Sequence, residues 1–135
     1  MNEIVLIVES DLMLIEDLRN FLALEGYETW TAINGAQALA LMEKRYLSCG
    51  LMPDCIVSVA RMPTMHGIDF LDTIRAHTCW EKIPFVLMSG INDNARNWLH
   101  RPRYDAQIRK PFAMHEFAQT IWDRIRASKA KRNLA

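Results

Sequence analysis

Short apolar runs alternate with segments of helical periodicity along most of this chain, and this alternation constrains the fold more than any other feature. Residues 4–8 form a continuous, mostly β-branched apolar run, which is typical of a central parallel strand with both faces covered. After Asp11, a suitable N-cap, apolar residues recur at helical spacing as far as Gly26. This pattern predicts a strand followed by a helix that stops before a C′ glycine.

The same alternation continues to the end of the chain. Strands alternating with helices imply right-handed crossovers and a parallel sheet with helices on both faces. We therefore expect an α/β, doubly wound domain of five parallel strands and about five helices. Further strands are predicted over 27–32, from 54 to 59, over 84–88 and around 108, and helices over 36–46, over 67–77 and from 111 to about 127.

The composition is that of one ordinary globular domain. The 135 residues carry 16 basic and 16 acidic side chains, a balance that argues against general affinity for nucleic acids or membranes. We expect one domain over residues 1–128 and a frayed basic tail over 129–135. Three widely spaced cysteines predict free thiols. The first apolar run is too short for a signal peptide or a membrane span, so we expect a soluble cytoplasmic protein.

Functional residues are expected where the strands end. In doubly wound sheets the ligand crevice lies at the carboxyl ends of the strands, beside the point where the strand order reverses. The residues at these ends are Glu9 and Ser10 after the first strand, Val59 at the end of the third, Ser89 after the fourth and Lys110 after the fifth. These five side chains carry most of the evidence about function.

The segments around these strand ends resemble the receiver domains of response regulators, which act in two-component and phosphorelay signalling. The similarity includes the apolar run 55–59 followed by Met62-Pro63 and Gly67, and the run Lys110-Pro111-Phe112. It extends from Ile4 to the last helix. The resemblance implies the flavodoxin-like strand order 2-1-3-4-5 and a role in signal transduction.

The match is uneven at the residues that carry the family's chemistry. In the family, two adjacent acids and an acceptor aspartate hold magnesium, a lysine pairs with the phosphoryl oxygens, and a serine or threonine responds to phosphorylation. Glu9 fits the first acid, but Ser10 stands in place of the second and Val59 in place of the acceptor. Ser89 and Lys110 fit the hydroxyl and lysine positions. The resemblance therefore implies a degenerate phosphorylation pocket.

Two further residues belong to this comparison. Gln107 occupies the switch position, where the family usually has a tyrosine or phenylalanine, and Arg61 adds positive charge near the rim of the pocket. With Glu9 balanced by Lys110, the pocket has little charge left to attract a divalent cation. We expect no catalytic residue, no metal ligand and no cofactor, and we do not expect an enzyme.

The segment from Asn92 to Tyr104 departs most from the family. Pro102 should end any helix there early, and Trp98, Arg101 and Tyr104 have the composition of a protein interface. The predicted function is that of an atypical, phosphorylation-independent interaction module. Its expected partners are signalling proteins, such as a histidine kinase or another regulator, with a homodimer as an alternative; nucleic acid and membrane are not expected.

Two other functions stay open on the sequence. One is a working phosphoacceptor that uses a displaced aspartate, for which Asp11 and Asp54 are the candidates. The other is a small-ligand sensor in the sheet crevice, although the first turn lacks a glycine-rich phosphate loop. A labile phosphoryl adduct would favour the first of these, and a bound chromophore or nucleotide the second.

Overall fold

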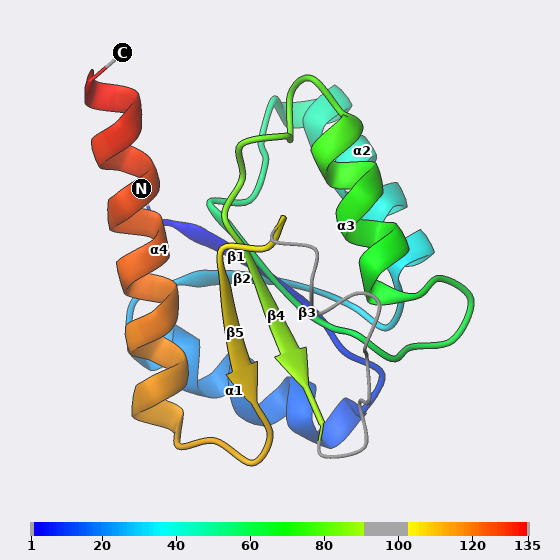
Figure 1. Cartoon of the computed structure of the whole chain (residues 1–135), viewed down its shortest axis with the longest axis vertical. Helices are drawn as coiled ribbons and strands as arrows, with labels where there is room; N and C mark the ends of the chain where they lie inside the picture. Colours follow the sequence, from blue (N-terminus) through cyan, green and yellow to red (C-terminus); the bar gives the residue numbers. More distant parts are fainter. Residues whose placement is uncertain (1, 91–102, 135) are drawn as a thin grey trace.

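A five-stranded parallel sheet forms the centre of the computed structural model, which describes residues 2–90 and 103–134 (Figure 1). Its strands run in the order β2-β1-β3-β4-β5, and every neighbouring pair is parallel. This confirms the predicted doubly wound sheet and its order. The strands are β1 (Ile4–Val8), β2 (Glu28–Ala32), β3 (Cys55–Val59), β4 (Phe85–Ser89) and β5 (Ala106–Arg109).

Helices cover both faces of the sheet. Helices α1 and α4 lie on one face and α2 and α3 on the other (Figure 1). The described residues contain four helices where about five were predicted, and most of the segment expected to hold the remaining one lies outside them. The helices are α1 (Leu12–Leu24), α2 (Gly35–Cys49), α3 (Gly67–Ala76) and α4 (Met114–Leu134).

Both predicted ends of the first helix are present. Asp11 is the N-cap of α1, and its Oδ1 accepts hydrogen bonds from the backbone N–H groups of Met13 at 3.0 Å and Leu14 at 3.3 Å. Gly26 follows the helix with φ +93°, a conformation that a side chain would strain. The ends of α1 are thus determined by local chemistry that is visible in the sequence.

The last helix differs from the prediction at both ends. It begins at Met114 rather than at Pro111, and it continues to Leu134 where a frayed tail was expected after about residue 127. Glu3, just before β1, binds the guanidinium of Arg126 at 2.6 and 2.9 Å and also pairs with Lys129. These ion pairs fasten the later turns of α4 to the body of the domain, which apolar periodicity could not reveal.

The pairing with Arg126 and Lys129 changes the pKa of the Glu3 carboxyl group. Burial acts to raise its pKa, but the hydrogen bonds and positive charges of Arg126 and Lys129 outweigh burial and lower the pKa below its ordinary value. A carboxyl group with a lowered pKa stabilises the fold above its unfolded-state pKa, and this contribution is lost as the pH falls through the folded-state value.

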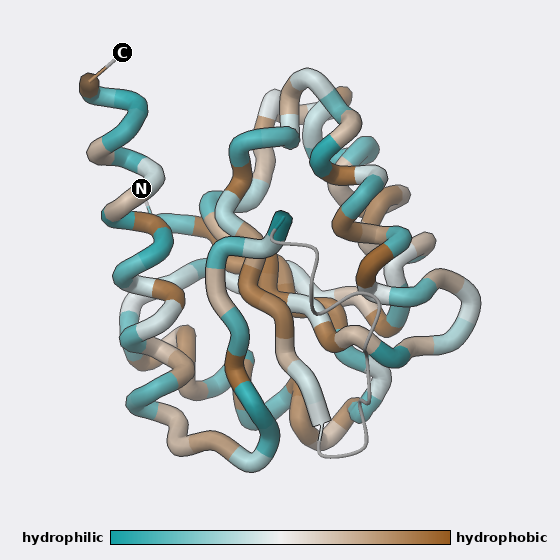
Figure 2. Tube along the Cα trace, viewed as in Figure 1, coloured by the Kyte–Doolittle hydropathy of each residue, from teal (hydrophilic) through white to brown (hydrophobic). Residues whose placement is uncertain are grey.

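Strand side chains alternate between two apolar layers. Val5, Val57 and Val59 pack toward α1 and α4, whereas Leu6 and Ile56 pack toward α2 and α3. Figure 2 shows hydrophobic residues concentrated along the central strands, whereas the helices alternate between hydrophobic and hydrophilic residues. Because both faces of these strands are covered, they are apolar throughout rather than at every second residue.

The cysteines behave as the sequence predicted, since all three are free. Cys55 is buried, and burial raises the pKa of its thiol well above the ordinary range, so it acts as a small apolar core residue. Cys49 and Cys79 are exposed. None of the helices in the described ranges is long and apolar enough to cross a lipid bilayer.

Candidate functional site

The carboxyl ends of β1, β3, β4 and β5 meet at one edge of the sheet, as the parallel topology requires. A small pocket of about 180 Å³ lies there. Its lining contains five of the residues singled out in the sequence, namely Glu9, Ser10, Val59, Arg61 and Lys110, together with Met88 and Gly90. Most of the predicted site residues therefore line one pocket.

The charged centre of this pocket is an ion pair. Lys110 Nζ donates a hydrogen bond to Glu9 Oε1 at 2.9 Å, across 101 residues of sequence. The Glu9 side chain is only 3% exposed and that of Lys110 32% exposed. Glu9 Oε2 is buried and has no hydrogen-bond partner among the described residues. The pairing predicted from the charge count is present, and in it the charges of Lys110 and Glu9 compensate each other.

Val59 lines the same pocket as these two charged residues. It is 5% exposed and packs in the apolar layer that faces α1 and α4. Ser58 is also fully buried, but it follows the strand alternation to the opposite face, and its Oγ donates to the carbonyl of Val59 at 3.0 Å. A hydroxyl group next to Val59 in sequence therefore does not replace the missing carboxylate.

A close backbone contact behind Val59 was not anticipated from the sequence. The N–H of Gly67 donates to the carbonyl of Ala60 at 2.8 Å, and a Cβ atom at position 67 would lie 2.2 Å from the carbonyl oxygen of Val59. Glycine is thus required where α3 begins, because the helix starts in close contact with the backbone at the end of β3. The sequence signal for this contact was a glycine directly before an apolar helical pattern.

Ser89 and Gln107 form a second polar link beside the pocket. Gln107 Nε2 donates to Ser89 Oγ at 2.8 Å between the neighbouring strands β4 and β5. Ser89 is buried, and neither residue belongs to the pocket lining. The predicted hydroxyl and switch positions are therefore joined to each other, a pairing that their separation of 18 residues did not reveal.

The predicted partner face is described only in part. Tyr104 is half-buried and packs against the apolar layer of α2 and α3. Trp98 and Arg101 lie outside the described residues. The role of this segment in partner binding stays a prediction.

Comparison with known proteins agrees with this arrangement of fold and strand ends. Residues 5–122 match the family model of the response regulator receiver domain. The chain belongs to this family. A solved structure of the signal receiver domain of a signal transduction histidine kinase from Syntrophus aciditrophicus is 26% identical, with a TM-score of 0.79 over 93% of this chain and 91% of that one. The receiver fold and a place in two-component signalling follow for this chain.

Curated relatives of this receiver domain are longer proteins. The transcriptional regulatory protein KdpE of Mycobacterium tuberculosis is 27% identical over 97% of the chain and 54% of its own length. The DNA-binding response regulator MtrA of Mycobacterium leprae is 29% identical over 93% of the chain and 52% of its own length. The chain thus spans about half the length of the curated relatives it matches. NtrX from Brucella abortus, 23% identical with a TM-score of 0.84 over 99% of this chain and 29% of that one, shares the fold.

The pocket of this receiver domain does not fit the magnesium ion that the family implies. Mg²⁺ requires a near-octahedral set of oxygen ligands, usually including one or two carboxylates. Among the described residues of the lining, Glu9 is the carboxylate, and one of its oxygens is already bound to Lys110. Within residues 2–90 and 103–134, no group of three or more His, Cys, Asp or Glu side chains is arranged to hold a metal. The site favours a stable ion pair over a bound cation.

Lys110→Met should destabilise the domain by about 3 kcal/mol, because it leaves the buried Glu9 carboxylate without its partner. Combining it with Glu9→Gln should recover most of this loss, with a coupling free energy of about 1–3 kcal/mol. Urea unfolding of the wild type, the two single variants and the double variant measures the cycle. Lys44→Met, at an exposed position on α2, is the control and should change stability by less than about 0.5 kcal/mol. Equal stability of Lys110→Met and the control would contradict a structural ion pair.

Proposed function

We propose that this receiver domain acts in two-component or phosphorelay signalling as a protein-interaction module that phosphorylation does not switch. The observation that carries the proposal is Val59 at the end of β3, where a receiver domain has its acceptor aspartate. A valine side chain has no nucleophilic atom, and phosphoryl transfer requires one. We propose no enzymatic activity for the chain.

The ion pair supports the same conclusion from electrostatics. A phosphoryl group carries negative charge that must be offset by a cation and by a lysine that is able to reach it. In this pocket Lys110 is bound to Glu9 at 2.9 Å, so its positive charge is already compensated. Beside the pocket, the Ser89 hydroxyl group, at the position that responds to phosphorylation in the family, already accepts a hydrogen bond from Gln107. The pocket is therefore suited to holding one conformation.

The two alternatives receive less support. Asp11 uses Oδ1 to cap α1, and Asp54, at the opposite end of β3, uses Oδ2 to accept a hydrogen bond from the backbone of Ile4 at 2.7 Å. Both candidates for a displaced acceptor thus have structural contacts. The pocket of about 180 Å³ is also smaller than the roughly 300–1,000 Å³ typical of small-molecule sites, which argues against a ligand sensor there.

The proposed partners are signalling proteins, with a histidine kinase or another regulator as the first choice and a second copy of the chain as the alternative. The balanced charge favours neither nucleic acid nor membrane as a partner, and we propose the cytoplasm as the location. Trp98 and Arg101 remain our proposed contact residues, on sequence grounds alone.

Partner capture from cells of the source organism tests this function. The tagged chain should retain the same signalling partners with and without acetyl phosphate and Mg²⁺, because binding does not depend on a phosphoryl group. Trp98→Ala combined with Arg101→Ala should abolish capture without unfolding the domain. The matched control, Trp122→Ala with Arg132→Ala on α4, should retain it. Capture that requires the phosphodonor would refute the proposal.

A further inference from the structure

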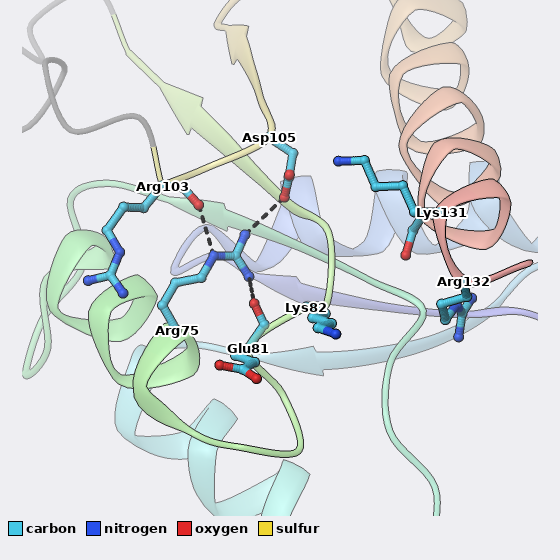
Figure 3. A pocket seen from close by; sticks show the side chains of 8 residues that line it. Arg75, Glu81, Lys82, Arg103, Asp105, Lys131 and Arg132 are labelled. Atoms are coloured by element: carbon cyan, nitrogen blue, oxygen red, sulfur yellow. Dashed lines mark hydrogen bonds and ion pairs between the residues drawn. The ribbon is translucent and has the colours of Figure 1, made fainter. Parts of the chain in front are cut away.

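A larger pocket lies at the opposite edge of the sheet from the degenerate site. It has a volume of about 570 Å³ and is bounded by the last turns of α4, the end of α3 and the segments that precede β4 and β5 (Figure 3). The residues that line it are mostly charged: Arg75, Glu81, Lys82, Arg103, Asp105, Ser128, Lys131 and Arg132. Among these described residues five cations face two carboxylates, so this part of the lining is positive.

Part of this charge is used within the protein. Arg75 binds the Asp105 carboxylate at 2.9 Å, and Arg103 binds Asp72, outside the lining, at 3.3 Å. The same oxygen of Asp105 also accepts the backbone N–H of Phe85 at 2.7 Å. The Asp105 carboxylate is therefore already compensated by contacts within the protein and does not neutralise the remaining lysines and arginine.

Three cations stay available to a ligand. The side chains of Lys82, Lys131 and Arg132 make no hydrogen bond or ion pair with any group in the described part of the chain. Figure 3 shows that they come from two separate elements, with Lys82 on the segment before β4 and the other two on the end of α4. The lining also contains the acidic side chain of Glu81. The available side chains of the pocket therefore carry an excess of positive charge.

The positive lining continues into an adjoining hollow of about 60 Å³. This hollow shares Lys82, Asp105, Ser128 and Lys131 with the larger pocket and adds Arg124. The helix dipole explains why cations are favourable in the last turn of α4, but it does not explain Lys82, which belongs to another element. Convergence of cations from different elements on one hollow is the feature that points to an anionic ligand.

The size and chemistry of the pocket narrow the class of ligand. Its volume lies within the roughly 300–1,000 Å³ of small-molecule sites. None of the eight described lining residues is aromatic, so a nucleobase would find no stacking surface. Lysine, arginine and a serine hydroxyl are suitable donors to phosphate oxygens. We propose that this pocket binds a compact anion that carries two phosphoryl groups, of the pyrophosphate or sugar bisphosphate type.

Isothermal titration calorimetry with pyrophosphate, without divalent cations and at fixed ionic strength near 0.15 M to limit general screening effects, tests this proposal. The wild-type chain should show saturable binding. Lys82→Gln combined with Lys131→Gln should weaken the affinity about tenfold or more, because two charge-assisted contacts are lost. Lys44→Gln with Arg109→Gln removes the same charge from exposed positions outside the pocket, and this control should bind like the wild type.

Each other outcome would overturn the proposal. Absence of saturable binding to the wild type would exclude a site for compact phosphate anions. An equal loss in the pocket variant and the control variant would mean that pyrophosphate responds only to net charge. An acidic peptide or a DNA duplex that binds the pocket when pyrophosphate does not would assign it to a macromolecule. Circular dichroism of all the variants verifies that they are folded.

Discussion

Ser10→Asp combined with Val59→Asp should give this receiver domain an affinity for Mg²⁺ at least about 100-fold above that of the wild type, since even outer-shell partners of metal ligands contribute about 10–100-fold. The two substitutions place carboxylates at the two pocket positions where the chain departs from its family. Together with Glu9 they supply the oxygen ligands and the negative charge that a hard cation needs. Calorimetric titration with MgCl₂ measures the change.

A matched variant separates this effect from the added charge. Leu47→Asp with Ser48→Asp introduces the same two charges at exposed positions near the end of α2, away from the pocket lining. It should bind Mg²⁺ no better than the wild type. A folded Ser10→Asp/Val59→Asp variant without any gain in affinity would show that something other than the missing carboxylates keeps the cation out.

Arg75→Ala should destabilise the domain by about 2–4 kcal/mol, because it removes a largely buried guanidinium whose hydrogen bonds join three segments of the chain. The Arg75 side chain is only 12% exposed, and burial, opposed by Asp105, lowers its pKa. Its guanidinium donates to the carbonyl oxygens of Arg103 at 2.9 Å, Glu81 at 3.0 Å and Ile83 at 2.7 Å, and to Asp105 at 2.9 Å. It thus joins α3 to the segments before β4 and β5.

Chemical denaturation measures this loss, and two further variants define its cause. Arg75→Lys should lose an intermediate amount of stability. The ammonium group of lysine lacks the planar, forked set of N–H donors with which the guanidinium binds four acceptors. Arg132→Ala, at an exposed position in the last turn of α4, should change stability by less than about 0.5 kcal/mol. An Arg75→Ala variant as stable as the wild type would show that water replaces the guanidinium without cost.

Local signals predicted the architecture well because each one has a local physical cause. The apolar run of β1, the Asp11 cap and Gly26 determine where the first strand and helix lie, and parallel topology then places the strand ends together. The pairing of Glu9 with Lys110 followed from charge balance once both were assigned to that edge. This part of the site depends on residue type and strand position alone.

The features that the sequence did not predict depend on contacts between distant segments. Gln107 meets Ser89 only because β4 and β5 are in register. Glu3 holds the later turns of α4 through Arg126, so the helix extends past the point where its apolar pattern weakens. The pocket lined by Lys82 and Lys131 likewise forms only when that extension faces the segment before β4.

The central claim is that the native pocket accepts no phosphoryl group, and an intact-mass spectrum tests it most directly. The wild-type chain is incubated with Mg²⁺ and acetyl phosphate beside an ordinary receiver domain as positive control. The account predicts an unchanged mass for this chain and a phosphoryl adduct on the control. An adduct on the wild-type chain would contradict the account, and Asp11→Ala and Asp54→Ala would then identify the acceptor.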